Sequence, residues 1–354
     1  MEKPEKSIAT AAKRAAFLAK KAKRKQRYSL DDYVSGILAG NKIMLSQAIT
    51  LIESTRADHQ ATAQEIVEAC LPHSKNSIRI GITGAPGVGK STFIENLGGF
   101  ITEKEHRLAV LAIDPSSQLS KGSILGDKTR MHQLSNHPRA FIRPSAAGDS
   151  LGGVARKTRE TIVLCEAAGF DTILVETVGV GQSEIAVHSM VDFFLLLLLP
   201  GAGDELQGIK RGIVEMADLI AVNKSDGDRL LLAKQTKQAY RNAIHLFPAK
   251  ESDWIVKVKN CSANTGTGIQ EIWETIKAYQ SFTQKNQFFD KNRQAQAKYW
   301  LDETITTALK QAFFHHPAVK KELAAIEKAV LSAERSPFKA AESLLKLYQN
   351  ETKD

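Results

Sequence analysis

The strongest chemical pattern in the chain is a glycine-rich stretch that ends in a lysine and two hydroxyl residues. It fits G-x-x-x-x-G-K-S/T and follows an apolar segment with strand character at 78–83. Glycines let several backbone N–H groups surround a phosphate chain, and the next helix points its positive end at the same phosphates. The sequence therefore predicts binding of a nucleoside triphosphate. The residues expected to contact it here are Gly84, Gly87, Val88, Gly89, Lys90, Ser91 and Thr92.

Two side chains of this loop have distinct expected roles. Lys90 would meet the β and γ phosphates, and Ser91 would hold Mg²⁺. An ordinary glycine-rich surface turn is the alternative. A strand before the loop, Lys-Ser-Thr at its end and an amphipathic segment after it favour the phosphate loop.

A second motif, Asn-Lys-Ser-Asp at 223–226, follows an apolar strand and matches the guanine-reading pattern N-K-x-D. The carboxylate of Asp226 can accept hydrogen bonds from N1–H and from the exocyclic amine of guanine, whereas adenine has an acceptor at N1. Lys224 can lie along the base plane, while Asn223 completes the motif. Ser262 and Ala263, on the next strand, supply the usual second contact to the base. The predicted nucleotides are therefore GTP as substrate and GDP as product.

Three acidic residues compete for the metal, and each follows a predicted strand or the loop beyond it: Asp114, Asp127 and Glu176. A carboxylate at the carboxyl end of a parallel strand beside the phosphate loop is well placed for Mg²⁺. Glu176 and Gly179 also occupy the places of a D-x-x-G element, in which the N–H of Gly179 would reach the γ phosphate. Capping of the next helix is the alternative role for such carboxylates. We expect Mg²⁺ to be held by these three residues and Ser91.

Hydrolysis requires a positioned water molecule and neutralisation of charge at the transferring phosphoryl group. Gln182 is a possible water-orienting residue, although an exposed loop glutamine without such a role is the equal alternative. Lys128, Arg130 and Lys210 could supply positive charge. The catalytic candidates are Lys90, Glu176, Gln182 and Lys210.

Two glycine-containing loops, 116–131 and 200–210, lie next to the expected γ-phosphate position. Such segments can change between ordered and disordered states as the nucleotide changes. Plain surface turns are the alternative. For the second loop we favour switching, because Asp204, Glu205 and Lys210 come immediately after a buried apolar strand.

Charge is unevenly distributed along the 354 residues. The formal net charge is +9, and residues 1–27 hold ten Lys and Arg against two Glu, so the remainder is nearly neutral. A basic tail on a neutral body indicates a solvated extension and makes a nucleic-acid partner unlikely, although weak contact with RNA or an acidic partner stays open. The tail lacks the apolar core of a secretory signal and the Arg-rich, acid-poor composition of a transit peptide, which predicts a cytoplasmic protein.

Neither disulfides nor a membrane span is expected. Cys70, Cys165 and Cys261 lie far apart, without a C-x-x-C pair or a His at ligand spacing, and are predicted to be buried thiols. The longest apolar run, 193–199, is too short for a bilayer, which needs about 20 residues, and suits a strand buried on both faces.

Strand and helix patterns alternate through the middle of the chain. The predicted strands are 78–83, 108–114, 140–143, 171–177, 193–199, 219–223 and 254–262. One predicted helix begins at Ser91, and the others span 154–168, 205–216, 228–246 and 269–283. The alternation predicts an α/β fold, a mostly parallel sheet with helices on both faces.

Helical patterns without strands flank this region. The first covers 29–71 and begins with Ser29 and Asp32 in a capping-box arrangement. The apolar positions of the C-terminal helices either pack on the sheet or form a dimer interface, and the spacing fits both. Those helices are predicted at 292–314, 318–333 and 338–348. We divide the chain into a basic extension (1–27), an N-terminal helical segment (28–75), a phosphate-loop GTPase domain (76–284) and a C-terminal helical dimerisation segment (285–354).

Several longer strings point to a family. They are G-A-P-G-V-G-K-S-T, V-L-A-I-D-P-S-S, the stretch 143–156, V-E-T-V-G-V-G-Q-S-E and L-P-G-A-G-D-E-L-Q-G-I-K-R-G. Together they resemble the MeaB/ArgK family of phosphate-loop GTPases, and the likeness covers about 78–262.

This resemblance implies a GTPase chaperone of adenosylcobalamin-dependent acyl-CoA mutases, chiefly methylmalonyl-CoA mutase, that guards cofactor loading and protects or reactivates the mutase. It also implies a homodimer through the C-terminal helices, Mg²⁺ ligation at Asp114, Asp127 and Glu176, and an additional switch at 200–210. Glu176 stands where common small GTPases carry Asp. This is usual for the family, but it weakens the transfer of a water-positioning role to Gln182.

Three other functions stay open as alternatives. A transport-associated kinase would need an acceptor-binding feature, and none stands out in the sequence. A nickel-delivering metallochaperone GTPase needs Cys or His ligands near the nucleotide, and the scattered cysteines argue against it. A nucleotide-gated RNA binder would use the basic tail.

Overall fold

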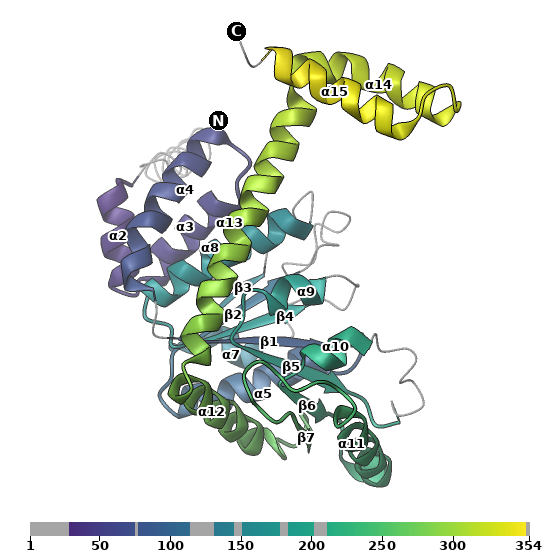
Figure 1. Ribbon diagram of the computed structural model, residues 1–354. Helices are drawn as coiled ribbons and strands as arrows, with labels where there is room; N and C mark the ends of the chain where they lie inside the picture. Colours follow the sequence, from purple (N-terminus) through teal and green to yellow (C-terminus); the bar gives the residue numbers. More distant parts are fainter. Residues whose placement is uncertain are drawn as a thin grey trace, which may run out of the picture.

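The computed structural model describes residues 28–74, 77–113, 131–144, 151–177, 183–201 and 211–351. Seven strands form one sheet in the order β3-β2-β4-β1-β5-β6-β7, and every neighbouring pair is parallel (Figure 1). The strands are β1 (Ile78–Gly84), β2 (Leu108–Ile113), β3 (Ala140–Pro144), β4 (Thr172–Thr177), β5 (Phe193–Leu198), β6 (Leu219–Val222) and β7 (Lys257–Asn260). The predicted α/β fold is confirmed, and the described strands are parallel throughout.

Helices cover both faces of the sheet because its central strands are apolar on both sides. In β5, Phe193 packs into the core on one face and Phe194 into the core on the other. The first face carries α5 (Lys90–Glu103), α7 (His132–Asn136) and α12 (Ile269–Lys285). The second carries α8 (Leu151–Ala167), α9 (Ser183–His188), α10 (Arg211–Met216) and α11 (Leu230–Ile244).

An additional helical layer lies outside α8, at the upper left of Figure 1. It consists of α2 (Leu30–Leu38), α3 (Lys42–Glu53) and α4 (Ala57–Cys70), and a short 3-10 turn, η1 (Leu71–His73), ends it. The predicted capping box is present: the Ser29 hydroxyl accepts from the Asp32 backbone N–H, and the Asp32 carboxylate accepts from the Ser29 N–H. Buried Ile37, Leu45 and Ile66 join the core that α8 shares with the sheet.

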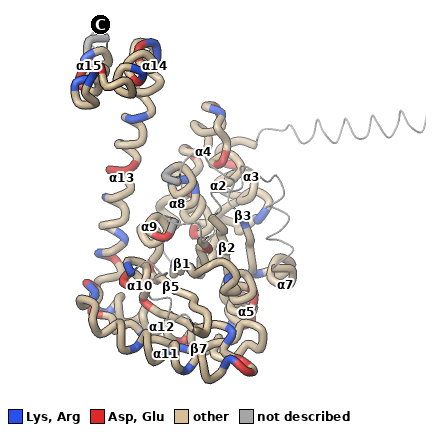
Figure 2. The backbone as a smooth tube through the Cα atoms, turned by 90° about the vertical axis from the view of Figure 1, so that its right-hand side faces the viewer, with Lys and Arg blue, Asp and Glu red and all other residues tan. Residues whose placement is uncertain are grey.

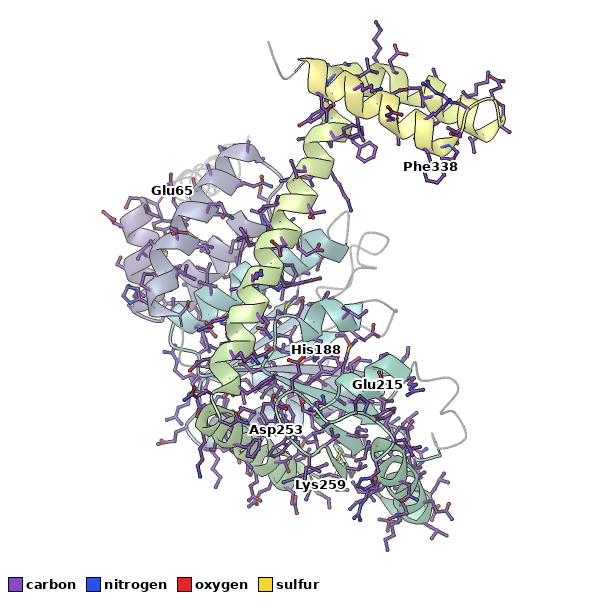
Figure 3. The ribbon with its side chains drawn as sticks, viewed as in Figure 1. Glu65, His188, Glu215, Asp253, Lys259 and Phe338 are labelled. Carbon is purple, nitrogen blue, oxygen red and sulfur yellow. The ribbon has the colours of Figure 1, made fainter. Side chains whose placement is uncertain are left out.

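The C-terminal helices leave the body of the molecule. Helix α13 (Phe288–His315) starts beside α12, runs past α8 and continues beyond it (Figures 1 and 2). Helices α14 (Pro317–Leu331) and α15 (Pro337–Glu351) form a hairpin at its far end. Phe338 projects from this hairpin with 87% of its surface exposed (Figure 3). In the described part of the chain, this hairpin contacts α13 and lies away from the sheet, whereas Trp300 of α13 packs into the core beside α8.

Three local differences from the sequence-based expectation have simple causes. Helices α7 and α9 were not expected, because five and six residues are too few for a clear periodic pattern. Strand β7 begins at Lys257, whereas the expected strand began at Trp254. The Trp254 ring instead packs on Tyr279 and donates its indole N–H to the Asp218 carbonyl at 3.0 Å.

Among the described helices, none combines the length and apolar composition needed to cross a bilayer.

A buried ionic network fixes the N-terminal end of α13 to the sheet. Arg293 donates two hydrogen bonds to the Asp192 carboxylate, at 2.8 and 2.7 Å, and one to the Ser77 carbonyl at 2.8 Å. Arg79 pairs with both oxygens of Glu166 at 2.8 and 2.9 Å. Burial raises the pKa of Glu166, but Arg79, Arg293 and Ser77 together outweigh burial and lower it. Each of these buried charged side chains therefore needs its oppositely charged neighbour to offset the cost of burial.

Replacing Arg293 by methionine is expected to lower the free energy of unfolding by about 3 kcal/mol, because the Asp192 carboxylate is left buried without its main counterion. Urea denaturation followed by circular dichroism measures this change. Arg56→Met removes an exposed arginine paired with Asp58 and serves as the control, with no measurable change expected. Equal midpoints for Arg293→Met and the unmodified chain would show that the network does not stabilise the fold.

Candidate functional site: the nucleotide pocket

The glycine-rich loop connects β1 to α5 at the carboxyl end of the sheet. Gly89 is the N-cap of α5 and has a φ of 95°, in the left-handed region that favours glycine. A Cβ atom on Gly89 would also lie only 2.8 Å from the Asn223 side-chain nitrogen. Gly87 has a φ of 78° and open space around it. The loop thus keeps its backbone accessible while the α5 N-terminus faces the same side.

Lys90 lies over this loop. Its Nζ donates to the Gly84 carbonyl at 2.7 Å and to the Ala85 carbonyl at 3.3 Å. Burial lowers the pKa of Lys90, while the charges of Glu176 and Glu184 act in the opposite direction. The ammonium group is thus held at the loop that the sequence assigns to phosphate binding.

Ser91 and Glu176 meet beside the loop. The Ser91 hydroxyl lies 3.4 Å from Glu176 Oε1, and Glu176 is buried near the end of β4. Strand register places Glu176 level with Ile82 of β1 and Ala112 of β2. A hydroxyl and a carboxylate at one point form an oxygen donor pair of the type that Mg²⁺ prefers, so these two residues fit the metal.

A threonine pair that sequence reasoning missed fixes the position of β4 against β1. The Thr177 hydroxyl donates to the Thr83 hydroxyl at 2.9 Å, and both side chains are buried. Threonine is common in strands, so nothing in the sequence distinguished these two. Because Thr177 directly follows Glu176 and Thr83 directly precedes Gly84, this bond holds the carboxylate beside the phosphate loop.

Asn223 connects three loops. Its side-chain NH₂ donates to the Val88 carbonyl at 2.9 Å, and its side-chain oxygen accepts from the Ala263 backbone N–H at 2.9 Å. The Cys261 thiol lies 3.7 Å from the same oxygen. Asn223 is buried, so it ties the phosphate loop, the end of β6 and the segment after β7 into one unit.

The neighbouring residues that the sequence predicts to contact the base lie on the same edge of the sheet. Lys224, with a φ of 57°, donates from Nζ to the Gly87 carbonyl at 2.9 Å. Asp226 is half-buried, and its backbone carbonyl accepts from the Arg229 N–H at 3.1 Å. Ser262 is fully buried, and its N–H donates to the Thr267 carbonyl at 2.9 Å. The structure therefore brings the phosphate loop and both predicted base-contacting segments together.

Other predicted residues stand as follows. Thr92, on the first turn of α5, is exposed, whereas Val88 is buried and contributes its carbonyl to Asn223. Glu184, which sequence reasoning did not single out, acts electrostatically on Lys90. The remaining candidates lie outside the described residues: Asp114, Asp127, Lys128, Arg130, Gly179, Gln182 and Lys210.

A model of the family described as methylmalonyl Co-A mutase-associated GTPase MeaB matches residues 45–318. The chain belongs to the MeaB family. The match begins within α3, takes in the whole nucleotide pocket and ends at the start of α14.

Other MeaB-family likenesses extend along most of the chain. A protein of Mycobacterium tuberculosis named as a probable GTPase is 46% identical over 319 residues, covering 90% of this chain and 95% of the relative. The mouse methylmalonic aciduria type A homolog, a mitochondrial protein, is 44% identical over 337 residues, covering 92% and 81%. A crystal structure described as an LAO/AO transport system kinase aligns with a TM-score of 0.74 and 34% identity, covering 90% and 97%.

The pocket and the family agree on the chemistry. The described loops bring together the residues that the sequence predicts to bind phosphate and guanine, the family model describes a GTPase, and the Mycobacterium tuberculosis relative is named a probable GTPase. This MeaB-family chain is therefore a phosphate-loop GTPase that binds guanine nucleotides and hydrolyses GTP.

Proposed function

We propose that this GTPase acts as a chaperone of an adenosylcobalamin-dependent acyl-CoA mutase of the methylmalonyl-CoA mutase type. It would couple GTP hydrolysis to cofactor loading and to protection of the mutase. The observation that carries the proposal is the match over residues 45–318 to a family whose description names that mutase. The mouse relative, whose name refers to methylmalonic aciduria, supports the same assignment.

The arrangement of the helices supports a chaperone role. The GTPase sheet is flanked by α2, α3 and α4 on one side and by α13 with its distal hairpin on another (Figure 1). None of these helices contributes a residue to the described nucleotide pocket. A protein that only hydrolysed GTP would not need them, whereas a partner protein needs contact area of this kind.

Turnover of GTP should be slow for the isolated protein and rise about tenfold or more when the methylmalonyl-CoA mutase of the same organism is added, because a partner can complete the charge stabilisation. Phosphate release at saturating GTP measures this, with bovine serum albumin replacing the mutase as control. If the mutase neither binds nor changes turnover, the chaperone proposal fails and the GTPase assignment remains.

We also propose that Mg²⁺ binds at Ser91 and Glu176, with Asp114 and Asp127 completing the site. Held by these residues, the metal would supply positive charge that offsets the negative charge of the phosphates during hydrolysis. The supporting geometry is the 3.4 Å approach of Ser91 to Glu176 at the phosphate loop.

Ser91→Ala is expected to raise the Mg²⁺ concentration needed for half-maximal turnover by about tenfold, because one oxygen ligand is lost. Ser91→Thr keeps a hydroxyl and serves as the matched control. Release of a fluorescent GDP analogue, with and without EDTA, gives a second readout: EDTA should accelerate release from the unmodified protein far more than from Ser91→Ala. An equal EDTA effect on both would remove Ser91 from the metal site.

We further propose a homodimer formed through the C-terminal helices. Large apolar side chains are exposed there although they belong to well-formed helices, which is typical of an interface. They are Leu301, Ile305, Leu309, Phe314, Leu331, Phe338 and Leu345. Sedimentation should give twice the chain mass of 38.8 kDa, and a monomer at micromolar concentration would contradict the proposal.

A further inference from the structure

Helix α11 begins with three leucines that are partly exposed, while its buried side is formed by other residues. Leu230, Leu231 and Leu232 are 50, 70 and 43% exposed. Ala233, Thr236 and Tyr240 are buried instead, and Ala233 and Tyr240 belong to the core against the sheet. A helix that served only the fold would place its leucines on the buried side, because that stripe is where apolar area is removed from water. The exposed leucines therefore call for an explanation outside the fold.

The same helix carries a basic stripe that continues from the leucines. Lys234, Lys237 and Arg241 follow Leu230 at intervals of four, seven and eleven residues, which places them along one side of the helix. Within the described part of the chain, these three cations form no ion pair. We call Leu230, Leu231, Lys234, Lys237 and Arg241 the α11 face.

The α11 face is connected to the nucleotide pocket through a short turn and a hydrogen bond. The turn Gly227–Arg229 joins α11 directly to Asp226, and the Arg229 N–H donates to the Asp226 carbonyl. The Thr236 hydroxyl accepts from the Gly201 N–H at 2.9 Å, and Gly201 follows β5, the neighbour of β1. A partner bound to the start of α11 would thus contact an element attached to both the base-reading turn and the strand beside the phosphate loop.

We propose that the α11 face docks the mutase partner at an apolar hollow bordered by Asp and Glu side chains. The proposal rests on the chaperone function proposed above and adds the surface through which it operates. The leucines match the hollow, and the cations match the acidic border. The helix lies at the outer side of the domain, next to β6 and β7, where a large protein can approach it (Figure 1).

Two other occupants fit these observations less well. RNA would use the cations, but leucines do not stack on bases, and the α11 face contains no aromatic residue. A second copy of the chain, joined symmetrically through this face, would set Lys and Arg against Lys and Arg. A protein whose apolar hollow is bordered by Asp and Glu would contact both the leucines and the cations of the α11 face.

The first test is the double variant Leu230→Ser with Leu231→Ser. We expect the dissociation constant for the mutase, measured by biolayer interferometry, to rise about tenfold or more, because central apolar anchors carry much of a docking interface. Basal GTP turnover and the melting temperature should stay unchanged, because both side chains are exposed. Leu246→Ser, with 82% exposure beyond the end of α11, is the matched control.

The second test reverses charge with Lys234→Glu and Arg241→Glu together. The association rate for the mutase should fall about tenfold at low salt, and the difference should shrink at high salt as screening increases. Lys285→Glu with Lys291→Glu, two exposed lysines near the α12–α13 junction, is the control.

The outcomes separate this inference from the proposed function. If the unmodified chain binds the mutase and both α11 variants bind it equally well, the docking surface is wrong and the chaperone function survives. If the variants instead lose binding to a single-stranded 20-mer RNA while mutase binding is unchanged, the occupant is RNA and the inference is overturned. If the unmodified chain does not bind the mutase, both fail.

Discussion

Lys90→Ala is expected to lower GTP turnover by about 10²–10³-fold, the usual loss when one positioned charge donor is removed from a transition state. The ammonium group is anchored to the Gly84 and Ala85 carbonyls, at the loop between β1 and α5. Alanine would leave the phosphoryl group that carries the developing negative charge without this cation. The loss should therefore appear in the chemical step as well as in binding.

Single-turnover hydrolysis with excess enzyme measures the chemical step, and titration of a fluorescent GDP analogue measures binding. Lys104→Ala, which removes the lysine just beyond the other end of α5, is the control and should behave as the unmodified protein. A Lys90→Ala protein that turns over within threefold of the unmodified protein would show that the catalytic pocket lies elsewhere. Circular dichroism on both variants separates loss of chemistry from loss of fold.

The sheet could be predicted from sequence because most of its strands are short apolar runs buried on both faces. The run that became β5, Phe193–Leu198, has no polar residue and cannot be an amphipathic element. Strand β7 was placed less well, since Trp254 looks like part of a strand but uses its indole N–H to bind the Asp218 carbonyl. Apolar character alone does not show whether such a side chain belongs to a strand or packs outside it.

The sequence motifs give candidate residues for the pocket, but they do not give the contacts that hold these residues together. Asn223 was recognised as part of the base-reading motif, yet its bond to the Val88 carbonyl joins positions 135 residues apart. The Thr177–Thr83 bond spans 94 residues. No local pattern encodes such a pair, because each partner has an ordinary role in its own element.

The outward direction of the helical faces was also hidden from sequence. The spacing of Leu301 and Leu309 fits both a contact with the sheet and a dimer interface, and the structure leaves both side chains exposed on α13. Helical periodicity identifies which residues share a face but not what covers that face. The same limit applies to α11, where Leu230 and Leu231 are exposed while Ala233, Thr236 and Tyr240 occupy the buried side.

Asp226→Asn is expected to change the nucleotide preference from guanine to xanthine. In its predicted role, the Asp226 carboxylate would accept from guanine N1–H and from the amine at position 2. An asparagine keeps one acceptor for N1–H, but its NH₂ group would face the guanine amine, and two donors repel each other. Xanthine carries an oxygen at position 2, which accepts from that NH₂ group. Asp226→Asn therefore mismatches guanine at position 2 and matches xanthine there.

The expected size follows from the burial of the site. A pocket built to hydrogen-bond a group discriminates strongly when a partner is missing, and Asp226 is half-buried, so GDP affinity should fall about 10²–10³-fold. Competition of GDP, XDP and ADP against a fluorescent GDP analogue, or against its xanthine counterpart for the variant, measures the three affinities. Asp228→Asn, an exposed aspartate two residues further on, should leave all three unchanged. If Asp226→Asn still prefers GDP over XDP, a residue other than Asp226 recognises position 2 of the base. Asp226 then does not select guanine, and the lysine and asparagine of the motif only position the loop.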